Sequence, residues 1–324
     1  MMEFPFLPFV LGEEDNLVYL PDHVAGIPLV KIPIHHAQVK IPLPLLDKST
    51  SKEPVHDRIS PTRFSRLLNI ANAYAYDEQL GMPEWVMLDC ALLPAFFTGF
   101  MKPVSQLSDR QHKDIDILLK KREEERTVSR RLVEANHDVD EGPLNEQEWF
   151  PIAEFCAIPR IHPHEVIGYS LYSLQAGWGL KAKALGLYLL SLLGYQKQQG
   201  IAQWSNLAAI KSHLRFNPLE LIDPLTTLHS KAGETFIYRL AIPSQAKLLR
   251  LLGLEENRES IDSQNEQSAD VSLHETVEVD GWYLAEKPQF WLKLKKQKEL
   301  SSIRLTQVRL HQSQVEVYLK TKMK

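Results

Sequence analysis

The chain has 324 residues, of which 44% are hydrophobic and 24% are charged, and its formal net charge is −4. This composition is ordinary for a globular protein and excludes collagen-like and disulfide-framework proteins. The longest apolar run, 184–195, is too short to cross a bilayer, and the chain begins without the basic start of a secretory signal, so we expect a cytoplasmic protein with no membrane span.

Composition divides the chain into four parts. Residues 1–54 are rich in proline and predict an extended or β segment that packs on the core, while 55–254 predict the main domain. Within that domain, the charged stretch 105–148 predicts a solvent-facing helical insertion. Residues 255–270 are polar and acidic, which predicts a linker, and 271–324 alternate well enough to predict a small antiparallel β module.

The main domain is predicted to begin with a helix, because Ser60 suits the N-cap and Pro61 the first helical position. Strands are expected on both sides of the insertion, and helices and strands alternate after it. Before the helix we expect strands at 17–20 and 27–32, and after it strands at 85–93, 96–100, 149–161, 166–174, 200–204, 218–222 and 234–240, and helices at 207–216 and 245–254. In the last part we expect strands at 276–279, 282–284, 290–294, 303–310 and 315–319.

A glycine turn joins the apolar strand 166–174 to the longest apolar helix pattern in the chain, and its sequence is Gln175-Ala176-Gly177-Trp178-Gly179-Leu180-Lys181-Ala182. Glycines here would let backbone N–H groups point outward at the positive end of a helix, which is a binding site for an anion. The alternative for a short Gly-x-Gly pattern is a plain connection between strand and helix.

The order of elements from about 60 to 240, and the spacing of three motifs, resemble the Gcn5-related N-acetyltransferase (GNAT) superfamily. Gly194 follows Gly179 by fifteen residues, as the glycine that often closes the helix in that family, and Asn206-x-x-Ala209 begins the next helix. His213 stands seven residues beyond Asn206, where many members have a tyrosine. The match is imperfect at Leu174, where the family has an arginine or glutamine.

The resemblance implies an α/β fold with a mixed, splayed β-sheet flanked by helices, and an enzyme that moves an acetyl or longer acyl group from acyl-coenzyme A to an amine. It implies that the turn receives the pyrophosphate of the co-substrate, that Asn206 contacts the pantetheine arm, and that a backbone N–H near Ser173 polarises the carbonyl. His213 would protonate the leaving thiolate, and Glu154 would act as general base through water. The implied binding residues are Leu174, Gln175, Gly177, Trp178, Gly179, Leu180, Lys181 and Asn206.

Two of these residues, His213 and Glu154, also have a structural interpretation. A histidine on a helix is often only structural, and Glu154 would otherwise be a solvent-facing residue of an alternating strand. We expect no metal, because His162-Pro163-His164 with Glu165 lacks a third well-placed ligand. Cys90 and Cys156 are expected to be small buried hydrophobic residues.

The last 38 residues form a separate basic segment, since 287–324 contain ten Lys or Arg and two Glu. Aromatic residues such as Trp282 and Trp291 among these lysines would stack on single-stranded nucleic acid, or would form an ordinary β core. An alternative function follows: a non-catalytic binding or assembly subunit of GNAT-like fold, whose residues 282–324 contact nucleic acid or a protein partner.

Overall fold

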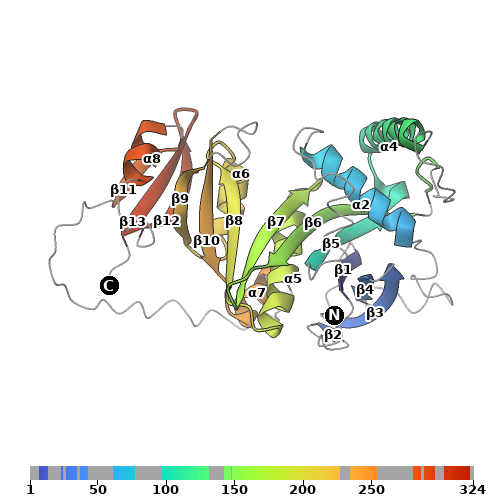
Figure 1. Ribbon diagram of the computed structural model, residues 1–324, viewed down its shortest axis with the longest axis horizontal. Helices are drawn as coiled ribbons and strands as arrows, with labels where there is room; N and C mark the ends of the chain where they lie inside the picture. The colour runs from blue at the N-terminus through green and yellow to red at the C-terminus, as the bar shows by residue number, and fades with distance from the viewer. Residues whose placement is uncertain are drawn as a thin grey trace. The chain divides into compact units, whose positions relative to one another are not determined.

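The computed structural model forms two compact units, Met1–Gln196 and Lys197–Lys324. Each unit has its own strands and helices (Figure 1). Among the described residues, no helix combines the length and the apolar character that a membrane crossing needs. The described residues are 7–13, 23–24, 27–34, 37–42, 61–76, 96–130, 142–146, 148–226, 234–253, 280–285, 288–295 and 303–321.

The first unit contains an antiparallel sheet whose strands follow the order β7-β6-β5-β1-β4-β3-β2. The predicted strands at 27–32, 96–100, 149–161 and 166–174 are confirmed, whereas those at 17–20 and 85–93 lie outside the described residues. The strands are β1 (Leu7–Glu13), β2 (His23–Val24), β3 (Ile27–Ile34), β4 (Ala37–Pro42), β5 (Phe96–Pro103), β6 (Trp149–Pro159) and β7 (Glu165–Ser173).

The N-terminal segment joins this sheet through its backbone. Leu7 to Gly12 of β1 pair with β5, and β1 also pairs with β4. A Pro-rich sequence forms strands here although proline cannot donate to a ladder, as at Pro8 opposite Phe100. The predicted β segment is therefore an extension of the sheet.

Two helices cover opposite faces of β6 and β7. Asn72 of α2 (Pro61–Tyr76) donates to Ser170 Oγ at 2.9 Å, whereas Gly179 of α5 (Trp178–Leu192) lies against Ser173 and Leu171. Because successive strand residues point to opposite faces, α2 and α5 lie on different sides of β7. Figure 1 shows these two helices on either side of the strands.

Helix α5 approaches the sheet very closely at Gly186. A Cβ atom at this position would lie 2.4 Å from Phe155 Cδ1 and 2.7 Å from Thr98 Oγ1. Thr98 Oγ1 also donates to the carbonyl of Ala182 at 3.0 Å. Glycine is therefore required by packing, because any side chain would push the helix away from β5 and β6.

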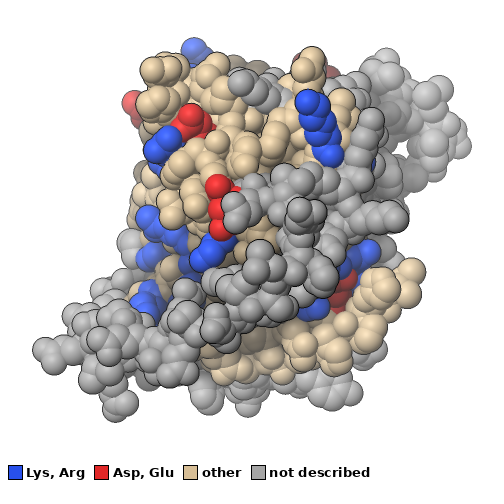
Figure 2. Space-filling model, turned by 90° about the vertical axis from the view of Figure 1, so that its left-hand side faces the viewer, with Lys and Arg blue, Asp and Glu red and all other residues tan. Residues whose placement is uncertain are grey.

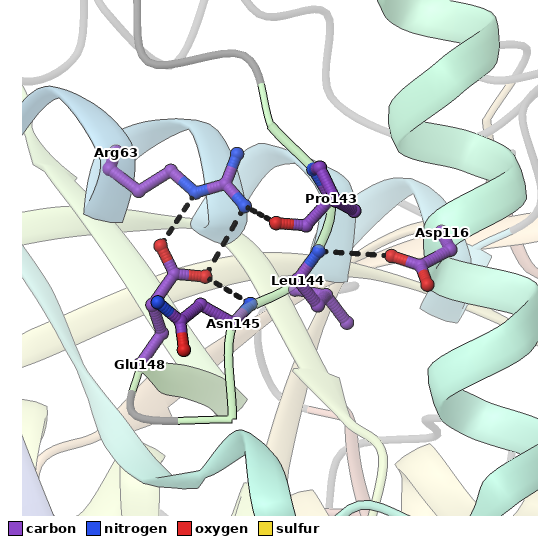
Figure 3. Close-up of polar contacts among 6 residues, drawn as sticks. All are labelled: Arg63, Asp116, Pro143, Leu144, Asn145 and Glu148. Atoms are coloured by element: carbon purple, nitrogen blue, oxygen red, sulfur yellow. Dashed lines mark hydrogen bonds and ion pairs between the residues drawn. The ribbon is translucent and has the colours of Figure 1, made fainter.

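The charged insertion contains the predicted helix, α4 (Asp109–Arg130), which follows a short 3-10 turn, η3 (Val104–Gln106). A segment formed by residues 142–146 and Glu148 follows α4 in the sequence and is held by Arg63 of α2 (Figure 3). The guanidinium donates from Nε to Glu148 Oε1 at 2.9 Å and from Nη2 to the Pro143 carbonyl at 2.9 Å. Asp116 Oδ1 of α4 accepts from the Leu144 amide at 3.1 Å, so α2 and α4 both bind this segment.

The second unit contains an antiparallel sheet with the strand order β11-β13-β12-β9-β10-β8. Its core includes a stack of three aromatic rings. The ring centroid of Trp204 lies 3.9 Å from that of Phe236 and 4.1 Å from that of Trp291. The elements are β8 (Lys197–Gln203), α6 (Leu207–Leu214), β9 (Leu219–Thr226), β10 (Thr235–Ala241), α7 (Gln245–Leu252), β11 (Gly281–Leu284), α8 (Pro288–Lys295), β12 (Ile303–His311) and β13 (Gln314–Thr321).

One predicted strand is wrong: 290–294 belongs to helix α8. The alternation Phe-Trp-Leu-Lys-Leu-Lys resembles a strand, yet Pro288 takes the first helical position, and Trp291 and Leu294, three residues apart, are both buried. The predicted strands at 282–284, 303–310 and 315–319 are confirmed, and 276–279 lies outside the described residues.

The predicted α/β class is confirmed in both units, because each combines a sheet with helices. Every pairing described within a unit is antiparallel, so the mixed, splayed sheet stays a prediction.

The C-terminal strands continue the sheet of the second unit, since Arg304 and Leu305 of β12 pair with Glu220 and Leu219 of β9. The four-part domain division also stays a prediction.

Candidate functional site

The predicted anion loop lies between the end of β7 and the start of α5. Leu174 still belongs to the sheet through its amide, which donates to the Ile152 carbonyl at 2.8 Å. Ser173 then bends the chain, because its Oγ donates to the Gln175 carbonyl at 2.5 Å. Gln175, Ala176 and Gly177 are exposed, so a ligand has access to the loop backbone.

The two glycines of the loop have different roles. Gly177 has φ +84° with nothing within 4 Å of a Cβ added there, so it is needed for its left-handed backbone. Gly179 is needed for close packing instead, because its Cβ would lie 3.1 Å from Ser173 Cβ. Together they bring the first turn of α5 directly against the end of β7.

The start of α5 has no side chain that caps it. The Trp178 amide donates to the Gln175 carbonyl at 3.2 Å and the Lys181 amide to Gly177 at 3.4 Å, whereas the Gly179 and Leu180 amides meet no acceptor among the described residues. The first N–H groups of a helix carry its positive partial charge and bind anions. Of the loop amides predicted to bind an anion, the Gly179 and Leu180 amides are therefore the best candidates.

Two other helices, α6 and α7, close their N-termini with side chains. Asn206 Oδ1 accepts from the Ala209 amide at 2.9 Å at the start of α6, and Ser244 Oγ accepts from the Lys247 amide at 3.4 Å at the start of α7. The open start of α5 therefore contrasts with ordinary capping in the same chain.

Trp178 and Lys181 shape the first turn of α5. The Trp178 ring is buried against Phe100, with centroids 4.9 Å apart, and the Lys181 ammonium lies 4.5 Å from the centre of the Trp178 ring. Partial burial lowers the pKa of Lys181 from its ordinary value. The tryptophan ring thus contacts a positive side chain of the same helical turn.

Glu154 lies on the α2 side of the sheet and is fully buried, so the prediction of a solvent-facing glutamate is wrong. It pairs in register with Tyr172 of β7. Glu154 is buried because β6 lies between β5 and β7 and its alternate residues face α2. Burial, and then the negative charge of Glu154, hold the pKa of the Tyr172 phenol well above its usual range. The Tyr172 hydroxyl has no hydrogen-bond partner among the described residues.

The sequence reasoning missed a polar seam between α2 and β7, to which Tyr172 belongs. Tyr76 of α2 donates its hydroxyl to the Leu171 carbonyl and accepts from the Leu171 amide at 3.0 Å. Burial raises the pKa of Tyr76 to about 12, and Glu154 adds to the shift. Asn72 and Ser170 complete the seam. The signal was available, because Asn72 and Tyr76 share one helical face and Ser170 and Tyr172 share one strand face.

The second unit holds the other two predicted site residues. Asn206 is the N-cap of α6, a structural role that the sequence reasoning did not assign to its side chain. His213 is buried and packs against Tyr238, with ring centroids 5.0 Å apart. The catalytic and binding roles of both residues stay predictions.

The turn at 162–165, which was weighed above as a metal site, is held by a polar contact and an ion pair. His164 Nδ1 lies 3.0 Å from the Gly194 carbonyl, and Arg160 forms an ion pair with Glu165 at 2.8 Å. In the part of the chain that the structure describes, no three His, Cys, Asp or Glu side chains gather as a metal site would require. Cys156 is buried, as predicted, and Cys90 lies outside the described residues.

The described residues also surround a surface hollow of about 570 Å³ beside α4. Its lining is of mixed charge, including His112, Asp116, Lys120 and Glu146, and contains none of the predicted site residues. Asp116 is already engaged by His112 and the Leu144 amide. The hollow adds nothing to the predicted anion site.

Comparisons with known proteins leave the family open. No family model matches the chain, and no curated protein matches it. Among solved structures, one similar to this chain is a crystal structure of a candidate acetyltransferase of the GNAT family from Desulfovibrio desulfuricans. The two are 10% identical, the match covers 55% of this chain and 90% of the other, and the TM-score is 0.31. This TM-score is too low for the likeness to support a conclusion about fold or function.

Proposed function

We propose that the protein is an acyltransferase that moves an acetyl or longer acyl group from acyl-coenzyme A to an amine. The observation that carries the proposal is the open start of α5, where the Gly179 and Leu180 amides follow an exposed glycine loop. Backbone amides at a helix N-terminus bind phosphate groups without any special side chain. The pyrophosphate of the co-substrate would occupy this position, with the Lys181 ammonium as a supporting positive charge.

The reaction itself needs no nucleophilic side chain. The amine nitrogen attacks the thioester carbonyl carbon, a C–N bond forms, the C–S bond breaks, the amine loses a proton and the thiolate gains one. The protein's part is to hold and orient the thioester, to polarise its carbonyl and to move protons. A backbone N–H near Ser173 would polarise the carbonyl.

Glu154 would accept the proton of the amine through water. Its full burial and its place beside the Tyr172 phenol provide a desolvated carboxylate next to the strand that ends at the loop. A carboxylate held beside the reacting amine can take its proton through a water molecule, which is the part of a general base. The family pattern assigns the pantetheine arm to Asn206 and proton donation to His213.

The loop assignment is tested by calorimetric titration of the full chain with acetyl-coenzyme A. Gly177→Glu places a negative side chain at the mouth of the loop and should abolish binding. Gly194→Glu is the matched control, because Gly177 and Gly194 have φ of +84° and +86° and both have open space at Cβ. The two variants therefore carry the same backbone strain and the same charge change.

Two outcomes would contradict the proposal. One is no heat of binding at millimolar acetyl-coenzyme A, and it would favour the non-catalytic alternative. The other is equal loss of affinity in Gly177→Glu and Gly194→Glu, since this would show that strain or charge alone, and not the loop, changes binding.

A further inference from the structure

The six-stranded sheet of the second unit has one face covered by helices. Tyr238 of β10 lies on this face against His213 of α6. Phe236, two residues earlier on the same face, stacks on Trp204, which in turn stacks on Trp291 of α8. Helices α6 and α8 therefore both pack on this side of the sheet.

The opposite face carries a row of charged side chains. Arg239 follows Tyr238 and so points to the other side. In register, Arg239 lies opposite Glu220 of β9, Glu220 opposite Arg304 of β12, and Arg304 opposite Lys320 of β13. Arg239 forms an ion pair with Glu220 at 3.0 Å, whereas Arg304 and Lys320 form none with any other described residue.

Aromatic side chains extend this row toward the edge of the sheet. Tyr318 lies two residues before Lys320 and therefore on the same face, and Trp282 of β11 pairs with it, with ring centroids 5.5 Å apart. The Arg309 guanidinium lies 4.0 Å from the centre of the Trp282 ring, and its Nε lies 2.7 Å from Glu316 Oε2. The Arg309 side chain is 47% exposed.

Three described acidic residues lie on or beside this face, and each has a partner: Glu220 and Glu316 are engaged by arginines, and Asp280 Oδ1 accepts from the Thr321 amide at 2.7 Å. Arg304 and Lys320 are therefore available to an anionic partner, next to an arginine stacked on tryptophan. Positive side chains beside aromatic rings fit a ligand that has both phosphates and exposed planar bases. We propose that this aromatic–basic face, formed by Trp282, Arg304, Arg309, Tyr318 and Lys320, binds single-stranded nucleic acid.

A single strand fits this face better than a duplex. The face runs from β11 across β13 and β12 to β9, which is three strand spacings or about 15 Å. Phosphates would contact Arg304 and Lys320, and bases would stack beside Trp282 and Tyr318. A duplex keeps its bases stacked inside, so it would use only the charges and none of the rings. This proposal does not depend on the acyltransferase.

General attraction to polyanions has to be separated from binding at this face. Figure 2 shows Lys and Arg on one side of the molecule with Asp and Glu among them, so the surface seen there is of mixed charge. The chain offers a matched control on the helix side, because Lys211 and Arg215 are exposed near the end of α6. Reversing two charges there changes the net charge as much as reversing Arg304 and Lys320.

The experiment is fluorescence polarisation of the full chain with a fluorescein-labelled 15-nucleotide oligo(dT) at 50 mM salt. Arg304→Glu with Lys320→Glu should weaken binding about tenfold or more and lower its salt dependence, whereas Lys211→Glu with Arg215→Glu should change it less than twofold. Trp282→Leu keeps all charges and should weaken binding about tenfold through lost stacking. Circular dichroism melts confirm that each variant is folded.

Three results would overturn the proposal. The first is no oligonucleotide binding by the native chain at 50 mM salt. The second is equal weakening by the two double reversals, which would indicate net charge alone. The third is equal affinity for the single strand and for its duplex, which would show that the aromatic rings take no part.

Discussion

Replacing Lys183 of α5 by methionine should stabilise the protein at neutral and acidic pH. Lys183 is fully buried, and its Nζ lies 5.9 Å from the centre of the Phe155 ring. Burial lowers the pKa of this lysine from 10.5 to about 7. The folded protein therefore resists holding the charge that the unfolded chain readily carries.

The magnitude follows from the size of the pKa shift. The fall of this pKa from 10.5 to about 7 corresponds to at most about 5 kcal/mol of unfolding free energy. Between these two pH values the unfolded chain binds a proton that the folded chain does not, so stability rises with pH across this window. Below pH 7 both states are protonated and the full penalty applies. Lys183→Met removes the penalty and keeps most of the side-chain volume.

Urea unfolding at pH 6, 7.5 and 9, followed by tryptophan fluorescence, measures this difference. We expect the variant to exceed the native protein by about 2–5 kcal/mol at pH 6, with a gap that narrows as pH rises. Lys113→Met, at an exposed lysine of α4, is the control and should not change the pH dependence. Parallel pH profiles for Lys183→Met and the native protein would refute the reasoning.

Three further substitutions test local contacts. Gly186→Ala should lower stability by about 1–3 kcal/mol through overpacking, while Gly142→Ala, which meets nothing within 4 Å, should be near neutral in the same thermal melts. Arg63→Met leaves Glu148 without its two guanidinium bonds and should cost about 1–3 kcal/mol in urea unfolding, and an unchanged midpoint would count against this contact. Asn206→Ala should cost about 1 kcal/mol by removing the N-cap, and Asn206→Asp should restore it; equal melting temperatures would contradict the capping role.

Local patterns in the sequence predicted the parts of the fold that depend on neighbouring residues. The strand at 166–174, the helix after it and the glycine turn between them were all predictable, because alternation, apolar periodicity and glycine position act within a few residues. Helix α8 was not, since its Phe-Trp-Leu-Lys pattern is compatible with both periods and only the packing of Trp291 on Trp204 decides between them.

Burial of charged residues was beyond the reach of sequence patterns. Glu154 and Lys183 are fully buried because strands and helices distant in sequence enclose them, and neither residue has a neighbour pattern that indicates this. The special role of Gly186 was missed for the same reason, since its close contacts with Phe155 and Thr98 are made across the sheet. The open start of α5 required the hydrogen bonds of the loop to be known.

The most direct test of the central claim compares acetyl-coenzyme A with acetyl-pantetheine, which has the same thioester but no pyrophosphate. If the Gly179 and Leu180 amides bind the pyrophosphate, the native chain should bind acetyl-coenzyme A at least about tenfold more tightly, and Gly177→Glu should erase that preference. Equal affinity of the native chain for the two compounds would contradict the claim.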